Sequence, residues 1–229
     1  MSKNPDDYSS SWDWCVNNST YHFDNNHADA PGEWFTLLGR FDGNWAEEVE
    51  LAQGKPITWA TRKFYSNDDN TISPMLEQEE NDLRTTGAPV DLQLTDAVFD
   101  ISAFPTLTQM SEYFGIEDGK IRMHCQQPGQ MFNIHIDKLQ ERCPDNVESI
   151  IRMSIMLTDW EPGQFYSYGT YTYSNWKAGD IHIFDWSNVP HATANASRKM
   201  RPVLQVTGLK TEKTLALLAA ATPDTVYKL

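Results

Sequence analysis

The alternation of apolar and polar residues in the second half of the chain predicts a series of short β-strands. Runs rich in aromatic and β-branched residues follow one another at close spacing, which is typical of strands. We expect strands at Lys120–Gln127, Met131–Asp137, Ser149–Asp159, Gln164–Tyr168, Tyr171–Trp176, Asp180–Trp186 and Arg201–Thr207. Turn-forming pairs such as Pro128-Gly129 and Pro162-Gly163 separate them. Many short strands without long intervening helices indicate an antiparallel sandwich or barrel.

The first half has a mixed pattern. Two strands are predicted there, at Glu33–Phe41 and Ile57–Tyr65. Helices are expected at Ser73–Arg84, Thr106–Phe114 and, near the end of the chain, Thr211–Ala221. We therefore predict a mainly β protein, with a β core at residues 119–229 and an N-terminal α/β elaboration at residues 1–118 that packs on it, forming one compact domain.

The charge is concentrated in the predicted N-terminal elaboration. The 229 residues carry a formal net charge of −14. Residues 1–118 hold 22 acidic and 6 basic side chains, whereas residues 119–229 hold 10 acidic and 12 basic ones. A chain this acidic is repelled by a phosphate backbone and by anionic lipid, so nucleic acid and membrane surfaces are not expected as partners. The acidity favours either solubility or a cationic substrate.

Neither a membrane span nor a disulfide framework is expected. No run of the sequence approaches the roughly 20 apolar residues that a spanning helix needs, and residues 1–11 are polar and acidic rather than a signal segment. The three cysteines, Cys15, Cys125 and Cys143, are too widely spaced for a Cys-x-x-Cys zinc site. A cytoplasmic location is the prediction.

Candidate metal ligands stand out on one predicted strand and after another. In Met131–Asp137 the alternation places Asn133, His135 and Asp137 on one face, and it places Phe132, Ile134 and Ile136 on the other, packed into the sheet. His191 follows the turn at Pro190. Two histidines and one carboxylate can bind one face of Fe(II) and leave its other positions open. A His-x-Asp pair alone also occurs on surface strands, so it is weak evidence by itself.

Arg201 adds a third element. It opens the last predicted strand, where alternation places it on one face with Val203 and Gln205. A cation that faces the inside of a barrel is costly unless it has a partner. The guanidinium fork suits the carboxylate of a dicarboxylate cosubstrate.

Together, His135-x-Asp137, His191 and Arg201 resemble the signature of the Fe(II)- and 2-oxoglutarate-dependent oxygenases, which have a double-stranded β-helix, or jelly-roll, fold. The similarity is greatest to the aspartyl/asparaginyl β-hydroxylase branch, which includes free-proline hydroxylases. The segments that carry this resemblance are Gln127-Pro-Gly129, Ile151-Arg152-Met-Ser154, Trp176-Lys-Ala-Gly-Asp180 and His191-Ala-Thr-Ala-Asn195. It covers residues of about 120–209.

The resemblance implies a role for each matching residue. His135, Asp137 and His191 would ligate the catalytic iron, at which O2 also binds. Arg201 would bind one carboxylate of 2-oxoglutarate. The remaining cosubstrate contacts would be Arg152, Ser154 on the same strand face, and His124. Protein β-hydroxylases of this branch often lack the carboxylate ligand, so the presence of Asp137 favours the free-amino-acid hydroxylases and disfavours halogenation.

The expected function is hydroxylation of an unactivated C–H bond in a free amino acid or similar small molecule. The alternative substrate is an Asp, Asn or Pro side chain in a peptide or protein. Two rivals are a non-catalytic jelly-roll protein that binds a carboxylate and a cupin-type enzyme that uses metal without 2-oxoglutarate. The tyrosines of the predicted hairpin Phe165–Tyr173 are expected to pack in the sheet or to wall a substrate pocket. His182 is expected to be a packed residue, or one that supports a metal ligand, rather than a ligand itself.

Overall fold

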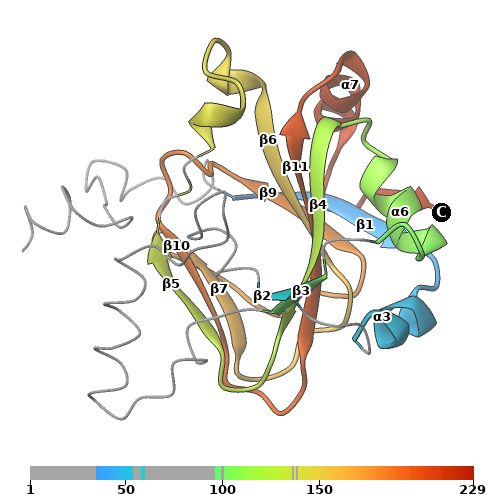
Figure 1. The fold of residues 1–229 in the computed structure, drawn as a ribbon, viewed down its shortest axis with the longest axis vertical. Coiled ribbons are helices and arrows are strands. Elements are labelled where there is room, and N and C mark those ends of the chain that lie inside the picture. The colour runs from blue at the N-terminus through green and yellow to red at the C-terminus, as the bar shows by residue number, and fades with distance from the viewer. Residues whose placement is uncertain (1–34, 54–57, 60–95, 99–100, 136, 138) are drawn as a thin grey trace, which may run out of the picture.

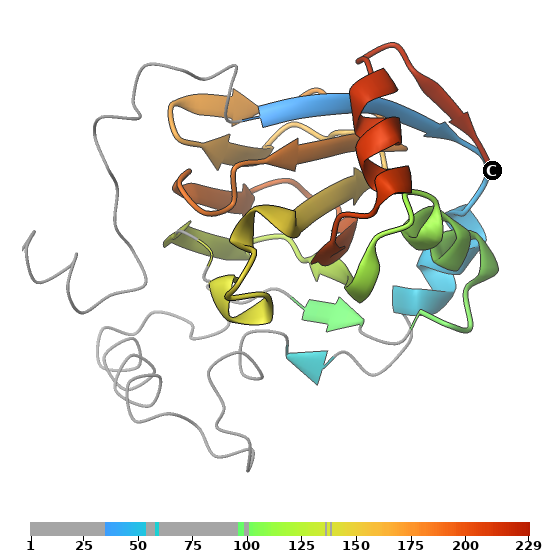
Figure 2. The same ribbon diagram turned by 90° about the horizontal axis from the view of Figure 1, so that it is seen from above.

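The structure is a computed structural model that describes residues 35–53, 58–59, 96–98, 101–135, 137 and 139–229. Eight strands form a large sheet with the order β12-β1-β9-β6-β11-β4-β3-β2 (Figure 1). Their bounds are β1 Phe35–Asp42, β2 Thr58–Trp59, β3 Asp96–Val98, β4 Glu117–Gln126, β6 Ile150–Met156, β9 Asp180–Phe184, β11 Arg201–Leu209 and β12 Val226–Lys228. Neighbours are antiparallel except β1 and β12, which lie side by side in Figure 2.

A second, four-stranded sheet faces the large one. Its order is β5-β10-β7-β8, with bounds β5 Met131–His135, β10 His191–Asn195, β7 Gln164–Tyr168 and β8 Tyr171–Tyr173. Side chains from both sheets pack together between them, including Met156 and Val203 from the large sheet and Tyr168 and Tyr173 from the small one. The predicted fold class, a mainly β jelly roll of the double-stranded β-helix type, is therefore confirmed.

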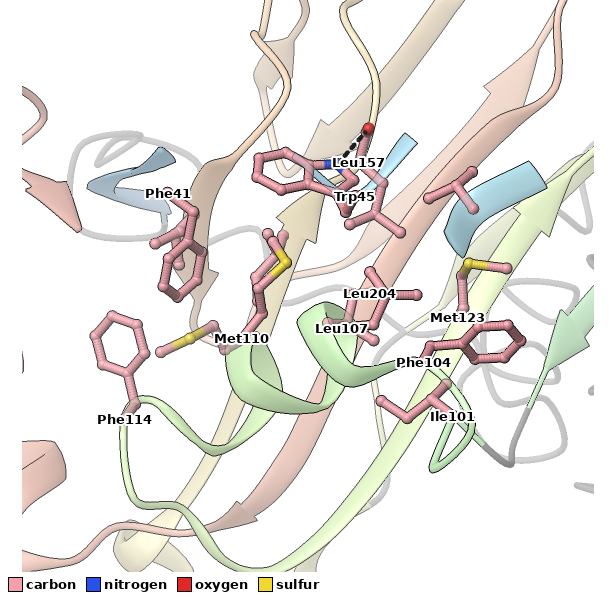
Figure 3. Close-up of a cluster of buried hydrophobic side chains, with 14 of the residues drawn as sticks. Phe41, Trp45, Ile101, Phe104, Leu107, Met110, Phe114, Met123, Leu157 and Leu204 are labelled. Carbon is pink, nitrogen blue, oxygen red and sulfur yellow. Dashed lines mark hydrogen bonds between the residues drawn. The ribbon is translucent and has the colours of Figure 1, made fainter. Parts of the chain in front are cut away.

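Helices cover the outer face of the large sheet. α3 (Ala46–Gln53) and α6 (Pro105–Glu112) lie beside it, away from the small sheet (Figure 1). Their apolar side chains meet the outer residues of the strands in a second core, where Trp45 Nε1 donates to the Leu157 carbonyl at 2.8 Å (Figure 3). α7 (Glu212–Ala220) and the 3-10 turns η4 (Gln140–Arg142) and η5 (Val147–Ser149) lie at one end of the barrel. None of the helices within the described ranges is long and apolar enough to cross a membrane.

Most predicted elements are confirmed with small shifts of their bounds. The seven strands predicted after residue 119 correspond to β4, β5, β6, β7, β8, β9 and β11, and the first predicted strand is β1. The hairpin turns at Gly169, which has a φ of 56°. The helix predicted at Thr106–Phe114 is α6, and the one at Thr211–Ala221 is α7, whose N-cap is Thr211. The predicted helix Ser73–Arg84 lies outside the described residues, as does most of the predicted strand Ile57–Tyr65.

Two details differ from the predictions. β10 was not predicted as a strand, because its sequence His191-Ala-Thr-Ala-Asn195 is poor in β-branched and aromatic residues. It is held as a strand by pairing with β5 on one side and β7 on the other. The expectation that Ile134 packs into the sheet is wrong, since it is 47% exposed. β5 is an edge strand of the small sheet, and the outer face of an antiparallel sheet can remain in water.

Candidate functional site

Three arginine side chains are buried inside the barrel. Arg122 on β4, Arg152 on β6 and Arg201 on β11 come from adjacent strands of the large sheet, and none is more than 6% exposed. The described residues include two buried carboxylates: Asp180, which pairs with a surface arginine, and Asp137, which lies beside Arg152. Among the described side chains the interior therefore holds more arginines than carboxylates, and a buried guanidinium such as that of Arg201 suits an anionic ligand.

Asp137 and His191 meet at one end of the barrel. β5 ends two residues before Asp137, and His191 begins the antiparallel partner strand β10. Asp137 Oδ2 lies 3.6 Å from His191 Nε2, which is too long for a good hydrogen bond, and both side chains are about nine-tenths buried. His191 Nδ1 lies 3.1 Å from the Val189 carbonyl oxygen. If Nδ1 donates that hydrogen bond, Nε2 keeps a lone pair directed toward the Asp137 side.

His135 lies across from His191 in the sheet register. The two residues are Cα partners on β5 and β10, and directly opposed residues of antiparallel strands occupy the same face. The structure describes the backbone of His135 but not its side chain. Among the described side chains, no group of three His, Cys, Asp or Glu residues gathers closely enough to hold a metal ion. Of the predicted triad, the structure brings the Asp137 and His191 side chains together, and it places the backbone of His135 opposite that of His191.

Arg152 holds Asp137 in place. Its Nη1 donates a hydrogen bond to Asp137 Oδ2, and its Nε donates to Thr207 Oγ1 at 3.1 Å. The predicted alternation is confirmed, because Arg152 and the buried Ser154 both lie on the strand face opposite that of Met153, which packs in the outer core. Arg152 and His191 therefore approach the same carboxylate oxygen from two sides.

Arg201 faces the interior, as alternation predicts. Its Nη1 donates to the Phe165 carbonyl at 3.0 Å, and its Nη2 donates to Thr193 Oγ1. Its guanidinium carbon lies 4.1 Å from the centre of the Tyr166 ring, so the cation stacks on an aromatic face. Thr193 is two residues after His191 on β10, which is about 7 Å along a strand. The Arg201 guanidinium and the Asp137 carboxylate therefore approach β10 at positions two residues apart, Thr193 and His191.

Four buried polar atoms around Arg201 have no hydrogen-bond partner among the described residues. They are Arg201 Nε, Tyr173 Oη, Trp176 Nε1 and His182 Nδ1. The Tyr173 ring centre lies 5.4 Å from that of Trp176 and 5.0 Å from that of His182, so these side chains are neighbours. Buried polar groups normally have a partner, and the arginine and tryptophan nitrogens can only donate. An acceptor, either water or a ligand oxygen, fits this place.

His124 and Arg122 complete the interior. His124 Nε2 lies 3.4 Å from Gln205 Oε1, and Gln205 is paired in register with both Arg122 and Ser154. Burial and the charge of Arg122 lower the pKa of His124 to about 3, so this histidine is neutral at pH 7. Burial and the charge of Arg152 lower the pKa of Arg122 to about 9. Sequence reasoning missed Arg122, although it alternates with His124 on the same face of β4.

His182 is a packed residue, as predicted. It is fully buried, and its Nε2 lies 2.8 Å from Tyr168 Oη. Burial and the charge of Arg201 lower its pKa to about 3 from an ordinary value of 6.5. Tyr166, Tyr168 and Tyr173 also line this interior, whereas Tyr171 of the same hairpin is 36% exposed. The hairpin therefore contributes three of its tyrosines to the wall of the barrel.

The buried His182 predicts a loss of stability in mild acid. Below pH 6.5 the unfolded chain binds a proton at this histidine, whereas the folded chain does not until the pH approaches 3. Stability therefore falls as the pH drops through this window, by about 2 kcal/mol at pH 5 from this residue alone. Urea unfolding at pH 7 and pH 5 measures the loss. His182→Gln keeps an acceptor for Tyr168 and should remove about that much of it; an equal loss in both proteins would contradict this assignment.

Comparison with known proteins gives a distant likeness only. No family model and no curated protein matches the chain. Similar solved structures include a prolyl hydroxylase from Trichoplax adhaerens in complex with a hypoxia inducible factor peptide fragment (11% identity, 94% of this chain and 97% of that chain, TM-score 0.47). A Pseudomonas putida prolyl-4-hydroxylase is also similar (14% identity, 80% and 96% coverage, TM-score 0.42). So is a cupin 2 conserved barrel domain protein from Salinispora arenicola (11% identity, 44% and 71% coverage, TM-score 0.29).

These values do not establish the aspartyl/asparaginyl β-hydroxylase branch that the motifs resemble. A shared jelly-roll architecture does not define a reaction, because one fold supports many functions. The function is therefore argued from the side chains of this chain.

Proposed function

We propose that the protein is an Fe(II)- and 2-oxoglutarate-dependent dioxygenase that hydroxylates an unactivated C–H bond of a free amino acid or similar small molecule. The observation that carries the proposal is the meeting of Asp137 and His191, 3.6 Å apart, at the end of an arginine-rich barrel. A carboxylate and an imidazole lone pair that converge without a direct hydrogen bond are suited to share one cation.

His135, Asp137 and His191 would hold the iron. The Val189 carbonyl orients His191 through Nδ1, and such a hydrogen bond fixes the tautomer that presents Nε2 to a metal. Arg152 orients Asp137, although it binds the oxygen that faces His191, so the carboxylate must share that oxygen or present the other one. When bound, iron and 2-oxoglutarate would activate O2, one oxygen atom of which converts C–H to C–OH while the other enters succinate, and carbon dioxide is released.

Arg201 would bind the distal carboxylate of 2-oxoglutarate. Its unpaired Nε, together with the unpaired donors of Trp176 and Tyr173, fits an acceptor group at this place. The spacing of two residues along β10 between His191 and Thr193 suits a five-carbon dicarboxylate that reaches from the metal to Arg201. Arg152, Ser154 and the neutral His124 are the other proposed cosubstrate contacts.

The proposal is tested by turnover and by metal analysis. Purified protein supplied with Fe(II), ascorbate and 2-oxoglutarate should release succinate slowly, and faster with a substrate from an amino-acid and peptide panel. The panel includes Asp, Asn and Pro residues in peptides, so it also tests the alternative substrate class. A mass increase of one oxygen identifies the product. Absence of succinate with every member of the panel, in protein that retains iron, would rule the proposal out.

Arg201→Met is expected to weaken 2-oxoglutarate binding by roughly 10- to 100-fold, because a hydrogen-bonded charge is lost. The measurements are the KM for 2-oxoglutarate in the succinate assay and the Kd for direct binding. Lys199→Met is the matched control, since Lys199 is an exposed cation that pairs with Glu161. An unchanged affinity in Arg201→Met would instead favour a metal enzyme that does not use 2-oxoglutarate.

One observation favours a second candidate, a non-catalytic protein that binds a carboxylate. Arg152 already pairs with Asp137, the only carboxylate in the proposed triad. In a binding protein this ion pair would be permanent, and iron would not displace it. Equilibrium dialysis with Fe(II) separates the two functions, because the binding protein would retain 2-oxoglutarate or another dicarboxylate while taking up no metal.

A further inference from the structure

A pocket of about 360 Å³ is lined by Arg152 and Phe184, which contact Asp137 and His191 respectively. It lies where β6 begins, and residues of η5 and α7 also line it. We call it the rim pocket and define it by four apolar and two cationic lining residues: Ile150, Ile183, Phe184, Trp186, Arg152 and Lys210. An apolar wall with a few charged groups is typical of small-molecule sites.

Both cations of the rim pocket have free hydrogen-bonding capacity. Arg152 is buried, with its Nε bonded to Thr207 and its Nη1 bonded to Asp137. Its Nη2 makes no hydrogen bond within the described part of the chain, so these donors are available to the pocket that Arg152 lines. Lys210 has no acidic side chain within ion-pair distance among the described residues. An unpaired guanidinium nitrogen and an unpaired ammonium at one pocket favour a carboxylate.

The two acidic residues that line the pocket are bonded within their own loop or exposed to water. The Asp185 carboxylate accepts four hydrogen bonds from Ser187 and Asn188, at 2.8 to 3.2 Å, and is therefore occupied by its own loop. Glu148 lies in η5 and is exposed, where water screens its charge. The hydrogen-bonding groups that remain for a carboxylate ligand are therefore the donors of Arg152 and Lys210.

The rim pocket adjoins the proposed metal ligands through two shared residues. The ring of Phe184 packs edge-on against the ring of His191, with centres 4.6 Å apart, and Phe184 also lines the pocket. Arg152 contacts Asp137 and lines the same pocket. Arg152 and Phe184 therefore border both the rim pocket and the Asp137–His191 pair.

We propose that the rim pocket binds the substrate, and that the substrate is a small carboxylic acid with a branched apolar body. Its carboxylate would accept hydrogen bonds from Arg152 Nη2 and Lys210 Nζ, while its body would pack on Ile150, Phe184 and Trp186. That the bound acid is a substrate, and not only a ligand, rests on the proposed function. The rim-pocket site assigns Nη2 of Arg152 to the substrate in place of the cosubstrate contact proposed above, and it leaves Arg201, Ser154 and His124 to hold the cosubstrate.

The test is a binding measurement on the full chain without iron or 2-oxoglutarate. Isothermal titration calorimetry compares 4-methylpentanoate with 4-methylpentan-1-ol, which has the same skeleton but no charge. The acid should bind at least about tenfold more tightly, because only the acid can engage both cations. Equal affinity for the two compounds, or no binding of the acid, would overturn the proposal.

Two variants locate the binding site. Lys210→Met should weaken binding of 4-methylpentanoate by roughly three- to tenfold and leave the alcohol unaffected. Glu148→Gln is the matched control at the same pocket, and it should leave binding of the acid unchanged or make it slightly tighter. Added 2-oxoglutarate should not displace the acid. Displacement by 2-oxoglutarate, or an unaltered Lys210→Met, would show that the acid binds elsewhere.

Carboxylate binding in the rim pocket and oxygenase activity can fail separately, and the experiments distinguish the two. Binding in the rim pocket is measured without metal, so it holds or fails independently of oxygenase chemistry. In one outcome 4-methylpentanoate binds but gains no oxygen atom in the presence of Fe(II), 2-oxoglutarate and O2, and no succinate forms with any compound. The pocket then remains a carboxylate site, and the oxygenase proposal fails. If succinate forms with other substrates while the acid does not bind, only the assignment of the rim pocket fails.

Discussion

His191→Ala is expected to reduce the affinity of the protein for Fe(II) by more than about 100-fold. The replacement removes the imidazole whose Nε2 lies 3.6 Å from Asp137 Oδ2, and with it one of the three proposed ligands. Loss of an outer partner of a metal ligand alone costs 10- to 100-fold in affinity, so loss of the ligand itself should cost more. Anaerobic equilibrium dialysis with Fe(II) measures the effect, and succinate formation should be lost in parallel.

The variant should still fold, because His191 begins a strand that is held by backbone pairing on both sides. Circular dichroism and urea unfolding check this point. Asp145→Ala is the control, since it removes an exposed carboxylate that is not one of the proposed ligands. If His191→Ala retains wild-type iron binding and wild-type turnover, then His191 is not a ligand and the proposed triad is wrong.

Asp137→Leu is expected to cost about 3 to 5 kcal/mol of folding stability in the metal-free protein. The carboxylate is buried with the guanidinium of Arg152, and removing one partner leaves the other charge buried without compensation. Arg122, whose pKa is already lowered by burial and by Arg152, adds to the repulsion that remains. Urea unfolding with a linear extrapolation gives the change in the free energy of unfolding.

A double-mutant cycle separates this cost from simple loss of packing. Asp137→Leu with Arg152→Met replaces the pair by apolar side chains, and it should recover more than half of the stability lost in the single variant. Asp137→Asn should cost less than Asp137→Leu, because the amide oxygen still accepts a hydrogen bond from Arg152. Additive losses in the double variant would show that Arg152 and Asp137 do not depend on one another for stability.

Local patterns were sufficient to predict much of this molecule. Alternation with a period of two, broken by pairs such as Pro162-Gly163, identified the strands of the second half, because a strand that is buried on one face must repeat its apolar residues at that period. The same rule predicted that Arg152 and Ser154 share one strand face and that Arg201 points inward. It failed for β10, whose small and polar residues form a strand only because β5 and β7 pair with it.

The relations between distant segments were not predictable in this way. Alternation on β4 could have identified Arg122, but nothing local shows that this arginine, Arg152 and Arg201 share one interior, since β4, β6 and β11 become neighbours only in the folded sheet. The ion pair of Arg152 with Asp137 joins a strand of the large sheet to the segment that follows β5, 15 positions earlier in the chain. Arg152 therefore competes with iron for the Asp137 carboxylate, and no sequence motif indicates this competition.

The sequence by itself determined which residue types face inward along each strand and which segments can turn, because strand periodicity and backbone conformational preferences are local properties. It also determined the candidates for iron and cosubstrate, because His135, Asp137, His191 and Arg201 have the residue types of such a site and together resemble an oxygenase signature. Only the tertiary structure decided which of these side chains meet, how strongly the buried arginines outnumber the carboxylates, and where the rim pocket opens. Those properties depend on register between strands and on the packing of η5 and α7 over the end of the barrel, and both are set by long-range contacts.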